Sequence, residues 1–154
     1  MRHIILIRKI FDLMTRYRQS KPEVKAGFGL LFGTRRVEES GNITLTITDA
    51  TVPRKKDLRR KYIWKIKSRH HWRIKEKLFE KSNGTVCVIG NWRTKPEDHP
   101  SPSDVDLRDW ERQFSVNEHL FDDMLFLLVG RKSSVMYRIG KERREPHEVM
   151  RIIG

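Results

Sequence analysis

The sequence contains one cysteine, Cys87, and no long hydrophobic run. A single cysteine cannot form a disulfide within the chain, and its neighbours in TVCVIG indicate a buried strand, so we expect a structural thiol. The apolar runs are far shorter than the roughly 18 residues that span a bilayer, and Arg8 and Lys9 interrupt the N-terminal one. The sequence therefore predicts a cytoplasmic protein with no membrane contact.

Acidic residues are scarce: 20 Asp and Glu stand against 33 Lys and Arg, which gives a net charge of +13. Most of the excess lies between Pro53 and Lys81, where 13 basic residues accompany 3 acidic residues. Such a segment predicts a surface that attracts nucleic acid or an acidic protein, although a solvated helix face would carry the same charge. The predicted phosphate contacts are Arg54, Lys55, Lys56, Arg59, Arg60 and Lys61.

The length of 154 residues suits one domain with one hydrophobic core, which we expect to span residues 1–154. Short apolar runs such as GLLFG and MLFLLVG alternate with polar segments, a pattern that predicts a sheet and excludes a disordered chain. The sequence shows no internal repeat and no low-complexity tract.

In the N-terminal half, the spacing of apolar residues predicts two helices around a hairpin. Apolar residues recur at spacings of three and four in residues 4–18, which predicts the first helix. The same spacing in residues 69–81, followed by Asn83-Gly84, predicts a second helix that ends there. Between them, AGFGLLFGTRR and ITLTITDA flank the turn residues ESGN and predict a strand hairpin.

In the C-terminal half, TVCVIGNW predicts a central strand, and the proline-rich segment RTKPEDHPSPS predicts a loop. The loop ends at Ser103. The Ser-x-x-Asp spacing from Ser103 to Asp106 stands in front of the amphipathic segment LRDWERQF, which we expect to be helical. MLFLLVG and SVMYRIG, separated by GRKS, predict a second hairpin. This order of helices and antiparallel pairs predicts an α/β (α+β) fold with a mixed sheet.

The stretch GNWRTKPEDHPSPSDVDLRDW resembles the zinc motif of the bacterial branch of the JAB/MPN (JAMM) metallopeptidase family. In that family a strand ends in Gly-Glu-Trp, His-x-His-Pro follows, and a proline-rich loop leads to Ser-x-x-Asp at a helix start. The resemblance extends to YRQSKPE, GLLFG, ITDAT and LLVGR, and therefore over most of the chain. It implies a mostly antiparallel, curved sheet flanked by helices, with the layering of the cytidine deaminases.

Matched onto this sequence, the family motif implies that Asp106 stands at the carboxylate ligand position and Ser103 at the serine that helps to hold the oxyanion. The two histidine ligand positions are occupied by Arg93 and Lys95, and the catalytic glutamate position falls on Ala26. Neither a guanidinium nor an ammonium group can be a zinc ligand. We therefore predict a site without zinc, in which one of the two cations forms an ion pair with Asp106.

Two other interpretations of these residues stay open. Ser103 and Asp106 also fit a helix capping box, a purely structural role. Alternatively, Asp106, His99 and Glu23 form an unconventional metal shell, with Glu23 as the substitute for the missing glutamate.

The resemblance implies a catalytically degenerate isopeptidase-like scaffold that is not an active enzyme. Its implied partner is a ubiquitin-like protein, a conjugation enzyme or another JAB/MPN subunit, in a bacterial mobile-element or anti-phage system. The predicted groove residues are Trp92, Thr94 and Pro96. No cofactor is expected, and zinc is expected only if the site is active. The alternatives are an active zinc-dependent isopeptidase and a nucleic-acid-binding protein that uses residues 53–81.

Overall fold

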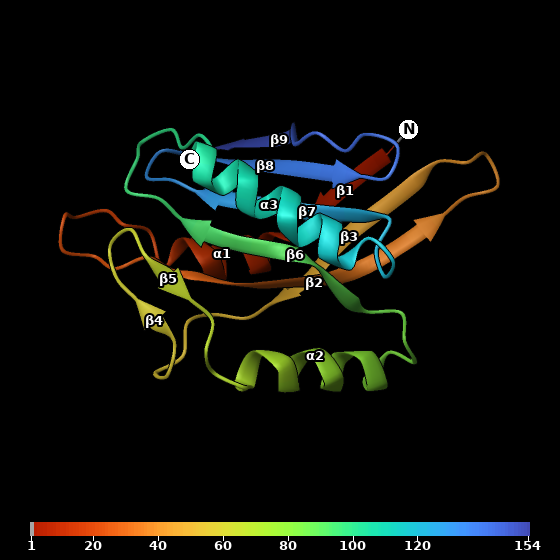
Figure 1. The fold of residues 1–154 in the computed structure, drawn as a ribbon, viewed down its shortest axis with the longest axis horizontal. Helices are drawn as coiled ribbons and strands as arrows, with labels where there is room; N and C mark the ends of the chain where they lie inside the picture. The colour runs from red at the N-terminus through yellow and green to blue at the C-terminus, as the bar shows by residue number, and fades with distance from the viewer. Residues whose placement is uncertain (1) are drawn as a thin grey trace.

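The computed structural model describes residues 2–154, which form one seven-stranded mixed sheet, a small hairpin and three helices (Figure 1). The predicted α/β fold with a curved, mostly antiparallel sheet is confirmed. Among the strand pairs of residues 2–154, only β1·β3 and β6·β7 are parallel. The strand order is β1 (Arg2–Leu6), β3 (Ile43–Ala50), β2 (Phe28–Val37), β6 (Cys87–Thr94), β7 (Asp123–Val129), β8 (Ser133–Gly140) and β9 (His147–Ile153). The remaining elements are β4 (Leu58–Arg59), β5 (Trp64–Lys65), α1 (Arg8–Thr15), α2 (His70–Lys81) and α3 (Asp104–Asn117).

Strand β7 is buried along its whole length because a helix covers each face of the sheet. Leu125 and Leu127 belong to the same core cluster as the apolar residues of α1. Phe126 and Leu128 belong to a second cluster with Trp110 of α3. Since alternate side chains of a strand point to opposite faces, α1 and α3 lie on opposite sides of the sheet. Within residues 2–154, no helix has both the length and the apolar character needed to cross a bilayer.

The predicted helix over residues 4–18 is wrong at its N-terminal end. Residues Arg2–Leu6 form a strand that pairs in parallel with β3, and α1 begins only at Arg8. Ile4 and Leu6 pack against the core whereas Ile5 is exposed, which is the period of a strand. The β-branched isoleucines favour this conformation, and β3 supplies hydrogen-bonding partners that the local sequence does not reveal.

The other long elements agree with their predictions. The β2–β3 hairpin turns at residues 38–42, and the half-buried Cys87 begins β6 near the centre of the sheet. Helix α2 ends before Asn83 and Gly84, whose φ angles are 55° and 82°. The short hairpin β4–β5 and the edge strand β9 were not predicted, because two-residue strands and a polar, half-buried edge strand carry little periodicity.

Candidate functional site

Asp106, in the first turn of α3, forms ion pairs with both cations that were predicted to replace a metal. The Arg93 Nη1 atom lies 3.2 Å from Asp106 Oδ1, and the Lys95 Nζ atom lies 2.8 Å from Asp106 Oδ2. The three side chains are only 14%, 10% and 6% exposed for Arg93, Lys95 and Asp106. We call these three residues the Asp106 ion cluster.

The geometry of β6 brings the two cations to α3. Residues two apart on an extended chain point to the same face, so Arg93 and Lys95 both face α3 while Trp92 and Thr94 face the opposite way. Trp92 and Thr94 are fully buried in the core. The prediction that these two residues line a groove is therefore wrong. Pro96 follows β6 and is not a lining residue of the groove that α3, the β4–β5 hairpin and α2 form beside Asp106.

The first turn of α3 holds Asp106 in place through a capping box, as one of the two alternatives for this pair predicted. The Ser103 hydroxyl accepts a hydrogen bond from the Asp106 N–H at 3.1 Å, and Asp106 Oδ2 accepts one from the Ser103 N–H at 2.9 Å. The carboxylate thus has backbone and side-chain donors at once, which fixes its orientation.

Burial alone would raise the pKa of Asp106, but hydrogen bonds from Lys95 and the Ser103 N–H, together with the charge of Arg93, outweigh it and lower that pKa below its ordinary value of 3.8. Burial lowers the pKa of the Arg93 guanidinium from its ordinary value, an effect that Asp106 opposes. A guanidinium remains charged at neutral pH even so. The site therefore holds one buried carboxylate between two cations, and Lys95 also forms an ion pair with the more exposed Glu97 at 3.5 Å.

These residues do not fit a zinc ion. Zinc needs ligand atoms with a free lone pair, and the Asp106 ion cluster supplies only one carboxylate. The alternative shell of Asp106, His99 and Glu23 is not assembled: within residues 2–154, no three His, Cys, Asp or Glu side chains are grouped so that they could hold a metal. The His99 ring contacts the Ser133 hydroxyl at 2.9 Å, and Glu23 is exposed.

The position predicted for the catalytic glutamate, Ala26, is fully buried beside the site. It immediately precedes Gly27, whose carbonyl accepts a hydrogen bond from the Thr94 N–H, so it lies close to the residues that follow Thr94. The Ala26 carbonyl accepts a hydrogen bond from Arg59 Nε at 2.7 Å. No carboxylate is present there to act as a general base.

A groove of about 650 Å³ begins at Arg93 and Asp106 and runs between α3, the β4–β5 hairpin and α2. Four large apolar side chains on its wall are exposed: Tyr62 at 65%, Ile63 at 58%, Trp72 at 47% and Val105 at 66%. Sequence reasoning missed this groove, because its walls come from segments that meet only in the folded chain. Exposed aromatic residues next to a buried charged site are typical of a surface that binds another protein.

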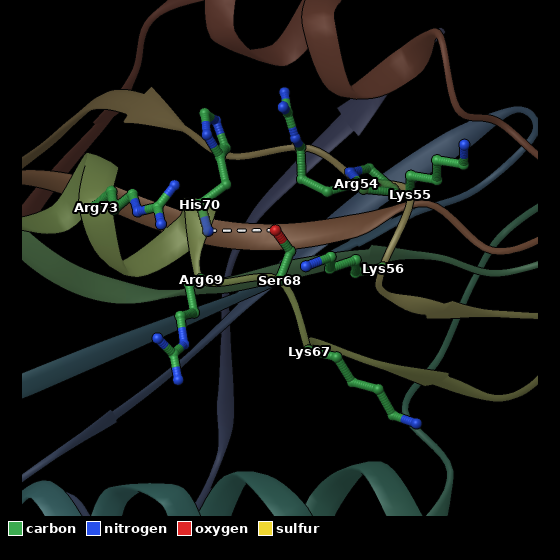
Figure 2. A pocket seen from close by; sticks show the side chains of 9 residues that line it. Arg54, Lys55, Lys56, Lys67, Ser68, Arg69, His70 and Arg73 are labelled. Carbon is green, nitrogen blue, oxygen red and sulfur yellow. Dashed lines mark hydrogen bonds between the residues drawn. The ribbon is translucent and has the colours of Figure 1, made fainter.

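The structure divides the predicted basic patch between two environments. Arg59 is bound to the Ala26 carbonyl, Lys61 lies over the Tyr62 ring at 5.2 Å and Arg60 is exposed in the β4–β5 turn. The other three residues line a separate cavity of about 660 Å³ at the start of α2 (Figure 2), joined there by cations that were not predicted. We call this cavity the α2 basic pocket; its cations are Arg54, Lys55, Lys56, Lys67, Arg69 and Arg73.

The curved sheet with helices on both faces defines the chain as an α+β domain. The solution structure of a protein from Desulfitobacterium hafniense has this fold, with a TM-score of 0.57 and 18% sequence identity over 96% of this chain and 91% of that one. No protein-family model matches the sequence.

Relatives named CD-NTase/cGAS isopeptidase identify the family. The Escherichia coli protein is 32% identical over 130 residues, which cover 84% of this chain and 78% of that protein. The Vibrio cholerae protein is 31% identical over 142 residues (92% and 83%), and the Pseudomonas aeruginosa protein is 32% identical over 114 residues (74% and 68%). The chain belongs to the CD-NTase/cGAS isopeptidase family, which confirms the isopeptidase relationship predicted from the sequence.

Proposed function

We propose that this chain is a non-hydrolytic member of its family that binds a protein partner in the groove beside Asp106. The Asp106 ion cluster is the observation that carries the proposal. A buried carboxylate without a compensating charge would cost several kcal/mol, and here Arg93 and Lys95 supply that charge in place of a metal. The resulting site is structured and electrostatically satisfied but contains no ligand set for zinc and no general base.

The partner follows from the names of the relatives. An isopeptidase for CD-NTase and cGAS acts on a bond between such an enzyme and a protein attached to it, so the proposed partner is a bacterial CD-NTase or the ubiquitin-like protein joined to it. The exposed Tyr62, Ile63 and Trp72 give the groove an apolar wall that suits an extended protein tail. The proposed setting is an anti-phage system.

A cleavage assay with a positive control tests the absence of hydrolysis. A CD-NTase conjugate that carries an isopeptide-linked ubiquitin-like protein would be incubated with this chain and, in parallel, with the Escherichia coli relative. We expect the relative to release the CD-NTase and this chain to leave the conjugate intact, as seen on a denaturing gel. Cleavage by this chain that a metal chelator abolishes would refute the proposal.

A binding assay tests the groove itself. The conjugate would be immobilised, and binding of this chain would be measured by biolayer interferometry. We expect binding that the double variant Tyr62→Ala/Trp72→Ala weakens at least about tenfold, since central aromatic side chains dominate protein interfaces. The matched control is Val116→Ala/Leu120→Ala, which removes two exposed apolar side chains away from the groove. Equal loss in both variants would contradict a role for the groove.

A further inference from the structure

The α2 basic pocket collects six cationic side chains from two chain segments, residues 54–56 and 67–73. Figure 2 shows these side chains arranged around Ser68 and His70, where the loop enters α2. All six are exposed. The pocket lies outside the groove beside Asp106 and shares no lining residue with it.

In the described part of the chain, the cations of this pocket have no ion-pair partners. Within residues 2–154, none of the six has a carboxylate within 4.0 Å, whereas most ion pairs of the molecule involve cations outside residues 53–81. Asp57 and Glu76 are the nearest acids along the chain. Glu76 is exposed, and the oxygens of Asp57 accept from His71 and from the backbone N–H groups of Arg54, Lys67 and Ser68. Like charges around one cavity repel one another, so an external anion would stabilise the arrangement.

Helix α2 adds to the positive potential. Its first turn contains no acidic residue. The Ser68 hydroxyl accepts a hydrogen bond from the His70 N–H at 3.2 Å, and the N-cap residue, Arg69, contributes no side-chain cap (Figure 2). The N-terminal end of a helix carries a partial positive charge and favours phosphate groups. The basic surface continues along one flank of the helix through Lys77 and Lys81, which line a neighbouring hollow together with His70 and Ile74. The helical period places the exposed Glu76 and Glu80 on the outer face of α2, away from this flank.

We propose that the α2 basic pocket and the flank of α2 that carries Lys77 and Lys81 bind the phosphodiester backbone of nucleic acid. The 12 residues of α2 span about 18 Å, a length along which one strand of a duplex presents about five phosphates. A single small anion would contact only part of this surface. Phosphates also match the forked geometry of Arg54, Arg69 and Arg73 and keep their charge at neutral pH. The contacts are to the backbone, so binding is independent of base sequence.

His70 provides a spectroscopic readout inside the pocket. Partial burial lowers its pKa below the ordinary 6.5, and the charges of Arg54, His71 and Arg73 lower it further, against a smaller opposite effect of Asp57. A bound phosphate would offset the nearby cations. The pKa of His70, followed by NMR, should therefore rise when nucleic acid binds.

The direct test is fluorescence anisotropy with labelled DNA duplexes of about 24 base pairs and RNA strands of the same length, titrated over a range of salt concentrations. We expect binding that weakens steeply with salt. The variant Lys55→Ala/Arg73→Ala should lose about tenfold or more in affinity at low salt, and its salt slope on duplex DNA should fall by about 2. Circular dichroism would establish that the variant is folded.

The matched control is Arg36→Ala/Arg108→Ala, which removes two exposed cations that lie outside the pocket. This variant should bind nearly as well as the wild type. Equal loss in both variants would show that binding follows net charge alone and would overturn the proposal.

Unlabelled competitors show whether the pocket binds nucleic acid, an acidic protein or small anions. Displacement of the labelled strand by polyglutamate as effectively as by unlabelled nucleic acid would identify an acidic protein as the partner and overturn the proposal. If tripolyphosphate binds as tightly as the full oligonucleotide, the pocket is a site for isolated anions, and the proposal is overturned. A preference for DNA or for RNA supports the proposal and names the source. Since the pocket is separate from the groove, these results do not depend on whether the chain cleaves a conjugate.

Discussion

At the residue scale, Asp106 combines two roles, because one carboxylate caps α3 and balances two buried cations. Replacing it with Asn keeps a capping side chain but leaves Arg93 without a counter-charge and Lys95 with only the more exposed Glu97, 3.5 Å away. We expect Asp106→Asn to lower the free energy of unfolding by about 3 kcal/mol at neutral pH. Urea denaturation would measure the loss, with the exposed Asp104→Asn as the control for removing a charge from the same helix turn.

The same side chain predicts a dependence of stability on pH. Because the pKa of Asp106 is lower in the folded state than its ordinary 3.8, its contribution to stability is complete above that value and is lost as the pH falls through the folded pKa. The difference in unfolding free energy between the wild type and Asp106→Asn should therefore be largest at neutral pH and shrink below about pH 3.8. A difference that persists in acid would show that the ion cluster is not its source.

Replacing Arg93 and Lys95 with histidine tests whether these two cations are the reason that no zinc site forms. Arg93 and Lys95 converge on the two oxygens of Asp106, so imidazoles at the same positions should converge with it as zinc ligands. We expect Arg93→His/Lys95→His to bind about one zinc ion per chain, measured by mass spectrometry of metal content after dialysis. Arg93→Gln/Lys95→Gln should bind none. Zinc in the wild-type protein at the same level would contradict the proposed function.

At the element scale, a buried hydrogen-bonded chain connects the end of β3 to α2. His71 is fully buried, with Nδ1 at 2.6 Å from the Thr51 hydroxyl and Nε2 at 2.7 Å from Asp57 Oδ2. Thr51 in turn accepts hydrogen bonds from the Leu30 N–H and, through its carbonyl, from the Trp92 indole. The sheet, the loop after β3 and α2 are thereby joined around one imidazole.

Removing that imidazole should loosen these elements selectively. His71→Ala leaves Thr51 and Asp57 buried with lost partners, and we expect a loss of about 3 kcal/mol in unfolding free energy. Hydrogen exchange should speed up first in α2 and in the β4–β5 hairpin, where few other contacts hold the chain. His70→Ala, a change of the half-exposed neighbour, should cost much less. Uniform loss of protection over the whole sheet would contradict this local role.

Most of the long strands and helices could be predicted from the sequence. Strands β2, β3, β6, β7 and β8 and helix α2 follow from periodicity and turn residues, and the contact of Asp106 with Arg93 and Lys95 follows from a motif with fixed spacing. Strand β1 and the groove do not, because both depend on partners distant in the chain. The misplaced Trp92 has a simpler cause: the alternation along β6 that brings Arg93 to α3 turns Trp92 into the core.

At the scale of the whole molecule, the charges form two groups: ion pairs on the sheet and unpaired cations in residues 53–81 of the described chain. On the sheet, Asp123 contacts Arg2, Arg35 and Arg138, so strands distant in sequence are tied by compensated charge. Residues 53–81 hold +10 of the net +13, and their Lys and Arg side chains have no ion pairs in the described part of the chain. Salt screens both attraction and repulsion between exposed charges, but it has little effect on buried ion pairs.

The repulsion should therefore dominate the response of the protein to salt. We expect the melting temperature to rise by a few degrees between about 20 and 200 mM sodium chloride, as screening relieves the unpaired cations of residues 53–81. In the variant Lys75→Glu/Lys81→Glu, which lowers the charge of α2 without touching the ion pairs on the sheet, the melting temperature at low salt should be higher and its rise with salt smaller. Differential scanning calorimetry measures both quantities. A wild-type melting temperature that falls with salt would show that attraction between the paired charges, and not the excess of cations around α2, controls the electrostatic stability of this fold.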